Sequence, residues 1–207
     1  MEAQSNSLPE SRRRRKLRDL LSYTLEGGMT QARNEIPASD LGALIERMHE
    51  DTVIPSRATS GSAGYDLRAY LRGRVVKCSD GVSQHEASAT VNGEEWGVAL
   101  APGEMALIPL GFRTRLPEGV EAQIRPRSGQ AFKNALTVPN APGTVDADYA
   151  EEWMVIVRND APIIRRIVHG ERIAQVVFSR YLPLSFEEAV VTRSTERAGG
   201  FGSTGQS

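Results

Sequence analysis

From residue 44 onward the chain consists of short apolar or alternating runs separated by proline and glycine, a pattern that restricts it to a fold made of strands. Helical periodicity of comparable strength is absent between these runs, whereas a parallel sheet would need helical crossovers of about a dozen residues. The sequence therefore predicts an all-β sandwich or barrel. The predicted strands are ALIPLGFRTRL, EAQIRP, WMVIVRN, RIAQVVFSRYL and EEAVV, and the predicted turns lie at residues 102–103, 117–119, 142–143, 159–162 and 169–170.

The overall composition predicts no particular partner. Of the 207 residues, 40% are hydrophobic and 25% are charged, and the formal net charge is −1, as in an ordinary globular protein. The single cysteine, Cys78, excludes an intrachain disulfide and any CxxC site. The apolar runs are far shorter than the roughly 20 residues of a membrane span, and the chain start lacks the basic-then-apolar order of a secretory signal. We therefore expect a cytoplasmic protein with no membrane partner.

Residues 1–43 differ from the rest of the chain and are predicted to be a basic extension, partly helical or disordered. Residues 12–18 carry a dense group of arginines and one lysine, and leucines recur at helical spacing until Gly27, so residues 12–26 could form a short amphipathic helix. The basic stretch 12–18 could bind nucleic acid, anionic lipid or another partner. The simpler interpretation is a solvated terminal extension, which is the usual behaviour of chain ends.

The last ten residues, 198–207, are rich in glycine and have little to bury. Their backbone amides, two hydroxyls and one aromatic ring suit an arm that closes over a phosphate chain while Phe201 stacks on a flat ring. The glycines also match G-x-G-x-x-G, but no helix can follow at the end of the chain. We therefore interpret this segment as a ligand-binding arm rather than a dinucleotide fingerprint.

Three internal segments place polar groups where a β-protein would normally have plain turns. Residues 63–69 hold Asp66 in a strand-like run after a glycine, and residues 125–129 offer two arginines and a serine, which are donors suited to phosphate oxygens. Residues 140–149 lead from a turn into Asp146 and Asp148, which would share a face of an extended strand. Each segment alone has an ordinary explanation as a surface acid or a salt-bridge partner.

Taken together and in this order, these segments resemble the motifs of the trimeric deoxyuridine triphosphatase (dUTPase) family. AGYDLRA, RPRSG, GTVDADY, GERIAQ and GGFGSTG are similar to its first to fifth motifs, and the resemblance runs from about Leu44 to the end of the chain. It implies a jelly-roll-like β-barrel over residues 44–197, assembled as a homotrimer with active sites shared between subunits. It also implies hydrolysis of dUTP to dUMP and pyrophosphate with Mg²⁺, which limits uracil in DNA.

The resemblance also implies roles for individual residues. Asp146 is similar to the base that holds the attacking water, and Asp66 to the acid that orients metal-bound water, with Mg²⁺ held by phosphates and waters rather than by direct protein ligands. Tyr149 resembles the residue packed under the deoxyribose, and Asn140 the residue that reads uracil. The remaining implied substrate-binding residues are Arg127, Ser128, Gly129, Gly143, Val145, Gln175, Arg197, Phe201, Gly202, Ser203 and Thr204.

The chain departs from the family pattern at several positions. Residues 150–152 read Ala-Glu-Glu where the family has a basic residue, glycine and an acid, Arg197 lies one residue closer to Phe201 than usual, and Gln130 replaces an apolar residue. Two alternatives therefore stay open. One is a dCTP deaminase of the same fold that uses Glu151 or Glu152 as a proton shuttle, and the other is a nucleotide-gated binding or regulatory protein.

Residues 71–100 are an insertion relative to the family. The runs RVVKC and SATV could pair as one hairpin with Trp96 packed at its base. This insertion could bind an additional partner, but we expect a decorative hairpin whose removal (residues 74–96) leaves turnover within a few fold. Cys78 is expected to be an inert small side chain. The three histidines lack ligand spacing, so we expect surface or structural roles for them and no metal site built from protein groups alone.

Overall fold

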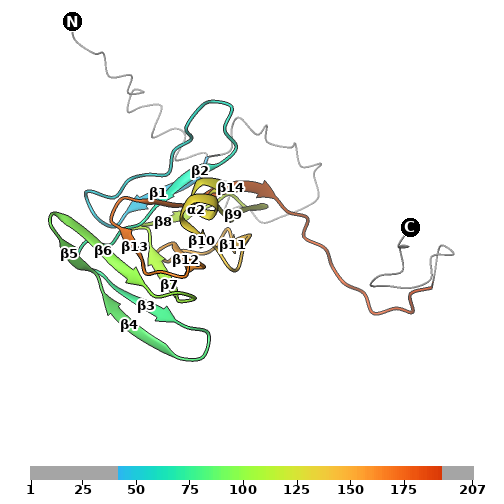
Figure 1. The fold of residues 1–207 in the computed structure, drawn as a ribbon. Coiled ribbons are helices and arrows are strands. Elements are labelled where there is room, and N and C mark those ends of the chain that lie inside the picture. The colour runs from blue at the N-terminus through green and yellow to red at the C-terminus, as the bar shows by residue number, and fades with distance from the viewer. Residues whose placement is uncertain (1–41, 193–207) are drawn as a thin grey trace, which may run out of the picture. The chain divides into compact units, whose positions relative to one another are not determined.

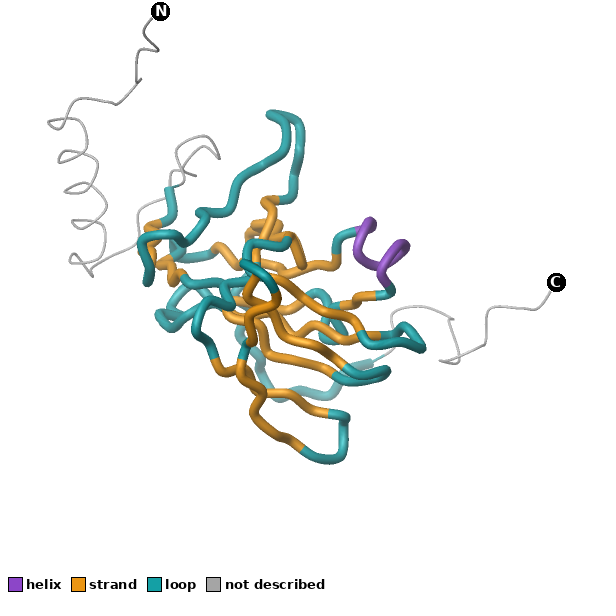
Figure 2. Tube along the Cα trace, turned by 60° about the vertical axis from the view of Figure 1, so that its left-hand side comes forward, coloured by secondary structure: helices purple, strands orange, loops and turns teal. Residues whose placement is uncertain are grey.

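The structure is a computed structural model that describes residues 42–192. Within this part of the chain nearly all regular structure is β-strand, and the exception is one short helix, α2 (Ser128–Asn134) (Figures 1 and 2). All strand pairs are antiparallel. The prediction of an all-β fold is thus confirmed.

The strands form four sheets. The four-stranded sheet consists, from one edge to the other, of β11 (Gly143–Val145), β9 (Val120–Pro126), β14 (Arg172–Arg180) and β2 (Tyr65–Arg68). The five-stranded sheet consists, again from edge to edge, of β10 (Leu136–Thr137), β12 (Met154–Asn159), β7 (Met105–Pro109), β3 (Val75–Ser79) and β4 (Gln84–Ser88). The smaller sheets are β13 (Arg165–Val168), β6 (Glu95–Leu100) and β5 (Thr90–Asn92), and β1 (Leu44–Arg47) with β8 (Phe112–Arg115).

The strands alternate between buried and more exposed residues, as strands with one face on a core must. On β9 Ala122 and Ile124 are buried while Gln123 and Arg125 face outward. Residues from the four-stranded and five-stranded sheets meet in one hydrophobic cluster, in which Trp153 and Phe112 are the largest fully buried side chains. Each such side chain contributes roughly 1.5–3 kcal/mol by leaving water, so the core fixes the outward face of the four-stranded sheet as a rigid platform.

Most predicted strands are present, because EAQIRP, WMVIVRN and RIAQVVFSRYL correspond to β9, β12 and β14. ALIPLGFRTRL is not one strand but two. Gly111 interrupts it with a φ of 75°, and a Cβ at this position would lie 2.7 Å from Thr52 Oγ1. The break allows β7 to pair with β12 while β8 pairs with β1 in a different sheet.

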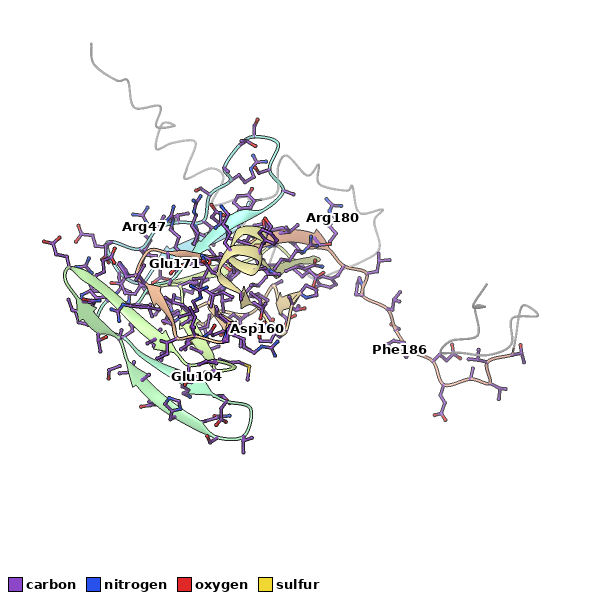
Figure 3. All side chains as sticks on the ribbon, viewed as in Figure 1. Arg47, Glu104, Asp160, Glu171, Arg180 and Phe186 are labelled. Atoms are coloured by element: carbon purple, nitrogen blue, oxygen red, sulfur yellow. The ribbon has the colours of Figure 1, made fainter. Side chains whose placement is uncertain are left out.

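Two other sequence expectations are wrong. EEAVV (187–191) forms no strand and pairs with none of the described strands, so Val190 and Val191 are almost fully exposed. Phe186 lies on the same extended segment after β14, away from the sheets (Figure 3). Helix α2 was not predicted, since its seven residues are too few to produce a helical period.

The insertion, residues 71–100, forms two hairpins rather than one. RVVKC becomes β3, but its partner is β4, whereas Thr90 and Val91 of SATV belong to β5 and pair with β6. Trp96, expected at the base of a single hairpin, instead packs against the core. The hairpins are not decorative, because β3 pairs with β7 and buries Val76 and Cys78 in the core. Removal of residues 74–96 would therefore take these side chains out of the core, which argues against a dispensable segment, while the effect on turnover stays a prediction.

The predicted helix at residues 12–26 and the glycine-rich arm at 198–207 lie outside the described residues. So do Arg197, Phe201, Gly202, Ser203 and Thr204. Among the residues that the structure describes, no helix has the length and apolar character needed to cross a membrane.

Candidate functional site

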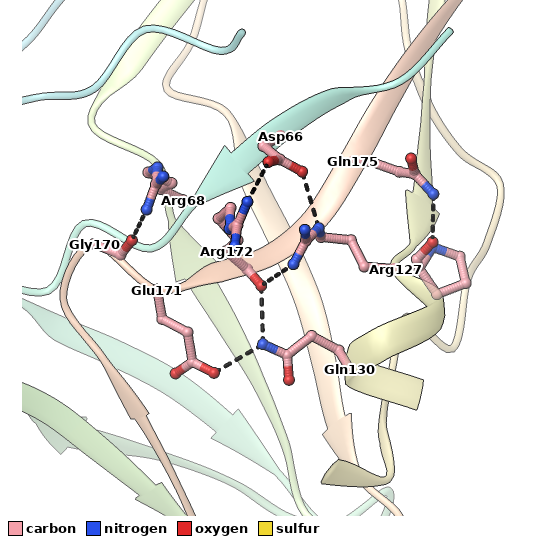
Figure 4. Close-up of polar contacts among 9 residues, drawn as sticks. Asp66, Arg68, Arg127, Gln130, Gly170, Glu171, Arg172 and Gln175 are labelled. Carbon is pink, nitrogen blue, oxygen red and sulfur yellow. Dashed lines mark hydrogen bonds and ion pairs between the residues drawn. The ribbon is translucent and has the colours of Figure 1, made fainter. Parts of the chain in front are cut away.

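Asp66 on β2 is the centre of a set of ionic contacts at one edge of the four-stranded sheet (Figure 4). Its Oδ1 lies 2.9 Å from Nε of Arg127, and its Oδ2 accepts a hydrogen bond of 3.2 Å from Nη1 of Arg172. Arg127 also donates a 3.4 Å hydrogen bond to the Arg172 carbonyl. The Asp66 carboxylate therefore holds two guanidinium groups side by side.

The strand register places further polar groups beside Asp66. Asp66 pairs with Gln175 on β14, and Gln175 pairs with Arg125 on β9. Because paired residues of neighbouring strands point to the same face, these three side chains form a row on the face opposite the core. Gln175 Nε2 donates a 2.9 Å hydrogen bond to the Pro126 carbonyl. The row thus brings acidic, amide and guanidinium groups together on three adjacent strands.

Gly64 lies directly against the end of the Gln175 side chain. A Cβ on Gly64 would lie 2.3 Å from Gln175 Oε1 and 3.1 Å from Gln175 Cδ. Any larger residue must therefore displace the Gln175 side chain and break its hydrogen bond to Pro126. Glycine at this position keeps Gln175 in place.

Gln130 attaches helix α2 to the start of β14. Its Nε2 donates to Glu171 Oε1 at 2.8 Å and to the Arg172 carbonyl at 2.9 Å, and its Oε1 accepts from Asn134 at 2.7 Å. The side chain is buried, and these contacts satisfy it. Gln130, a departure from the family pattern, therefore fixes the residues just before it, Ser128 and Gly129, next to Arg172.

Asp66, Arg127, Gln175 and neighbouring residues line a cavity of about 450 Å³. Two arginines, two serines and one side-chain amide line it, and Asp66 is the one acid among the described lining residues. Guanidinium, hydroxyl and amide groups are donors that suit the oxygens of a phosphate chain. The lining residues are Ala58, Ser62, Ala63, Gly64, Asp66, Arg125, Arg127, Ser128, Gly129, Gln175 and Val177.

The third predicted motif lies at the other edge of the same sheet, on and after β11. Gly143 and Val145 are buried, and Gly143 approaches Asn140 so closely that a Cβ would lie 3.0 Å from Asn140 Nδ2. A turn follows, in which the Tyr149 amide donates to the Asp146 carbonyl at 3.2 Å. The side chains of Asn140, Asp146 and Tyr149 are exposed.

Asp66 and the third motif lie on the two outer strands of the sheet. Strands β9 and β14 lie between β11 and β2. At about 4.8 Å per strand, the backbones of β11 and β2 are about 14 Å apart. The structure thus brings together Asp66, Arg127, Ser128, Gly129 and Gln175, and it leaves Asn140, Gly143, Val145, Asp146 and Tyr149 as a separate group.

Glu152, in the altered third motif, has a structural position. It is buried and accepts hydrogen bonds from Arg74 Nη2 and, at 2.9 Å, from the Gly111 amide. Its carbonyl accepts a 3.3 Å hydrogen bond from the Tyr149 hydroxyl. Arg74, at the base of the insertion, therefore supports the loop that carries Tyr149, and the Glu152 carboxylate is not available as a proton shuttle.

The sequence indicates Arg125 only as one of the two phosphate donors in residues 125–129, and it indicates no role for Arg172. Arg125 lies two residues before Arg127, and strand alternation could have placed it on the outward face. Arg172 could not be placed in this way, because β14 has an irregularity between Arg172 and Ala174. Ile173 and Ala174 are consequently both buried, and Arg172 returns to the same face as Gln175.

Known proteins share both the sequence and the fold. The dUTPase family model matches residues 96–205. Deoxyuridine 5′-triphosphate nucleotidohydrolases of Rhizobium rhizogenes and Roseobacter denitrificans are 44% and 42% identical over 153 residues, which is 73% of this chain and 85% and 86% of those proteins. The Brucella melitensis protein of the same name is 38% identical over 178 residues, 86% of this chain and 99% of that protein.

Solved structures agree at the level of the fold. A variant of the Staphylococcus bacteriophage 80alpha dUTPase, solved with dUpNHpp, has a TM-score of 0.61 at 22% identity and covers 79% of this chain and 98% of its own. The dUTPase of Streptococcus mutans has a TM-score of 0.54 at 20% identity, with coverage of 69% and 98%. From the matched family model and these relatives, we conclude that the chain belongs to the dUTPase family.

Proposed function

We propose that this protein hydrolyses dUTP to dUMP and pyrophosphate. Water attacks the α-phosphorus, and the bond from that phosphorus to the oxygen bridging to the β-phosphate breaks. The observation that carries the proposal is the cavity in which Arg125, Arg127, Ser128 and Gln175 converge around Asp66. A triphosphate needs this kind of lining, because phosphoryl transfer depends on positioning and on neutralising charge. The nucleotidohydrolase names of the relatives support the choice of substrate.

The proposed nucleoside-side roles belong to the β11 edge. Asp146 accepts the proton of the attacking water, Tyr149 packs under the deoxyribose, and Asn140 reads the uracil edge beside the backbone of Gly143 and Val145. A carboxylate is an adequate base for a water that is already positioned. The exposure of Asn140, Asp146 and Tyr149 supports these roles, since each side chain is free to meet a ligand.

We propose further that the protein is a homotrimer whose active sites lie between subunits. The support is geometric, because Asp66 in the cavity and the β11 residues lie on opposite edges of one sheet. A neighbouring copy can supply the missing edge to each cavity, and cyclic symmetry then repeats the arrangement. In this proposal residues 44–197 form the catalytic domain and residues 198–207 form an arm. Arg197, Phe201, Gly202, Ser203 and Thr204 close the arm over the nucleotide.

Magnesium fits the cavity as an ion carried by the substrate. Asp66 is the one carboxylate among the described lining residues, and both its oxygens already contact arginine, so the cavity offers no cage of protein oxygens. Mg²⁺ commonly keeps several waters and binds substrate phosphates, and Asp66 would hold such waters in place. When bound, Mg²⁺ supplies positive charge that offsets the charge of the triphosphate.

The direct test is to incubate the purified protein with Mg²⁺ and separately with dUTP, dCTP, dTTP and UTP. The nucleotides are resolved by anion exchange, and pyrophosphate and ammonia are measured. We expect equal amounts of dUMP and pyrophosphate from dUTP alone. Ammonia from dCTP would instead indicate a deaminase. Binding of dUTP without turnover would favour a nucleotide-gated binding protein, with partners reached through residues 12–18 or 71–100.

The proposed substrate is a free nucleotide, so the proposed site of action is the cytoplasm. This proposal can be examined by cell fractionation, which should recover dUTP hydrolysis in the soluble fraction.

A further inference from the structure

Three side chains that can bind a metal ion meet on the five-stranded sheet, away from the nucleotide cavity. Cys78 on β3 and His85 on β4 are direct cross-strand partners, and Glu104 precedes β7. The cysteine sulfur, a ring nitrogen of His85 and a carboxylate oxygen of Glu104 all lie within 4.8 Å of one another. None of the three takes part in the proposed hydrolysis.

The distances suit a small tetrahedral ion. His85 Nε2 lies 3.2 Å from Glu104 Oε1. Zinc ligands at about 2.0–2.3 Å from the ion are about 3.3–3.8 Å from one another in a tetrahedron. The three groups therefore need only small side-chain rotations to bind one ion, without any movement of the strands.

The burial of the three groups also suits a bound ion. Cys78 is 2% exposed and the Glu104 side chain 14% exposed, whereas the His85 side chain is 56% exposed. Two ligands are thus fixed by the core, and the third lies at the surface, where an ion can enter. Glu104 is held further by its Oε2, which accepts a 2.7 Å hydrogen bond from the Ala101 amide (Glu104 is labelled in Figure 3).

We propose that Cys78, His85 and Glu104 bind one Zn²⁺ ion, with water as the fourth ligand. A thiolate and an imidazole select zinc over the oxygen-preferring Mg²⁺ and Ca²⁺. Ligands from β3, β4 and the start of β7 would join the outer hairpin of the insertion to the centre of the sheet. The ion would therefore stabilise the fold and leave nucleotide chemistry unchanged.

The thiol chemistry is consistent with metal-dependent ionisation. Burial, together with the nearby Glu104 charge, raises the pKa of the Cys78 thiol. Without an ion the thiol is therefore protonated and unreactive, whereas a bound cation favours the thiolate. Binding should release a proton, which a weakly buffered titration can measure.

The test is a Co²⁺ titration of the full chain after metal removal with EDTA, without nucleotide. We expect one Co²⁺ per chain, with a near-ultraviolet thiolate-to-cobalt charge-transfer band that Zn²⁺ abolishes. Zn²⁺ should also raise the thermal unfolding temperature. Cys78→Ala should abolish the band. In His85→Ala and Glu104→Gln, Co²⁺ should bind too weakly for the band to reach its full intensity at one Co²⁺ per chain. Gln at residue 104 keeps an acceptor for the Ala101 amide, so it separates metal binding from support of the turn.

Glu86→Gln is the matched control, because Glu86 follows His85 on β4 and alternation directs it to the opposite face. It should keep the full band, and all these variants should retain Mg²⁺-dependent dUTP hydrolysis within a few fold of the unmodified protein. Absence of the band in the unmodified protein overturns the proposal. So does a band that still reaches full intensity at one Co²⁺ per chain in both His85→Ala and Glu104→Gln. Because the His85 side chain is exposed, His85→Ala should fold. Its Co²⁺ titration therefore tests the proposed site even if Cys78→Ala does not fold.

Discussion

The two edges of the four-stranded sheet are built differently. At the β2 edge Asp66, Arg127, Arg172 and Gln175 hold one another in a connected set of contacts around a cavity. At the β11 edge the Asp146 side chain is exposed and makes no hydrogen bond or ion pair with any of residues 42–192. The comparison indicates that the groups at one edge already hold one another in place, whereas in our proposal the other edge becomes a site only when a second chain covers it.

The largest effect should come from the exposed edge. Asp146→Asn removes the proposed base and should lower kcat at least about 100-fold while dUTP binding persists. Steady-state kinetics and a binding isotherm measure the two effects separately. Asp148→Asn is the matched control, because this acid lies two residues away in the same turn and should keep near-normal kcat. A normal rate for Asp146→Asn would remove Asp146 from its role.

The proposed role of the β2 edge in phosphate binding can be tested by removing one guanidinium group. Arg127→Ala deletes a donor to phosphate and the partner of Asp66 Oδ1, and it should lower kcat/KM about 10- to 100-fold. Arg113→Ala removes a comparable arginine–carboxylate pair, with Glu46, outside the cavity. It should leave kcat/KM unchanged. Equal losses in both variants would mean that Arg127 acts only on stability.

A smaller effect should follow from disturbing the packing at the same edge. Gly64→Ala forces the Gln175 side chain away from Pro126 and should lower kcat/KM several-fold without unfolding the protein. Gly61→Ala, in the same loop, has nothing within 4 Å of the added Cβ and should be silent. Kinetics together with thermal unfolding compare the two variants. Identical kinetics for both would show that the Gln175 contact has no role in turnover.

The smallest expected effect is a pH dependence of stability. It comes from His169, which lies outside both edges of the four-stranded sheet. Burial lowers the pKa of His169, an effect that nearby Arg72 reinforces and Asp51 opposes, and its Nδ1 accepts a 3.1 Å hydrogen bond from the Leu71 amide. The unfolded chain therefore takes up a proton at higher pH than the folded chain, so stability falls as the pH drops through the ordinary histidine value.

Unfolding temperatures measured between about pH 7.5 and pH 5.5 should show this fall. His169→Asn keeps an acceptor for the Leu71 amide but cannot take up the proton, so its unfolding temperature should depend less on pH. An equal pH dependence in both proteins would assign the fall to other groups.

Much of this architecture could be predicted from the sequence, because it depends on local patterns. Alternation within EAQIRP and RIAQVVFSRYL predicts strands, whereas the grouping of the polar segments is implied only by their resemblance to the dUTPase motifs. The bulge at Arg172, by contrast, changes the facing of side chains without any sequence signal. EEAVV ends in two β-branched valines that favour a strand, but a strand also needs a pairing edge, which composition does not reveal.

The cluster around Cys78 shows the same limit. Cys78 and His85 are seven residues apart, a spacing with no meaning as a ligand motif until the turn between β3 and β4 is known. The hairpin register then places them opposite each other, and pairing of β3 with β7 brings Glu104 into reach. Sequence spacing identifies such sites only when the connecting turn is itself predictable.

The proposed division of the active site between chains can be measured by mixing two impaired variants. Arg127→Ala and Asp146→Asn are unfolded together, refolded as a mixture and assayed for dUTP hydrolysis. If each site takes its cavity from one chain and its β11 edge from another, every mixed trimer regains one site, and the mixture recovers about a quarter of normal activity. Asp146→Asn mixed with Tyr149→Ala, both at the β11 edge, should recover none. Activity of the first mixture no higher than the average of its two components would contradict a shared site.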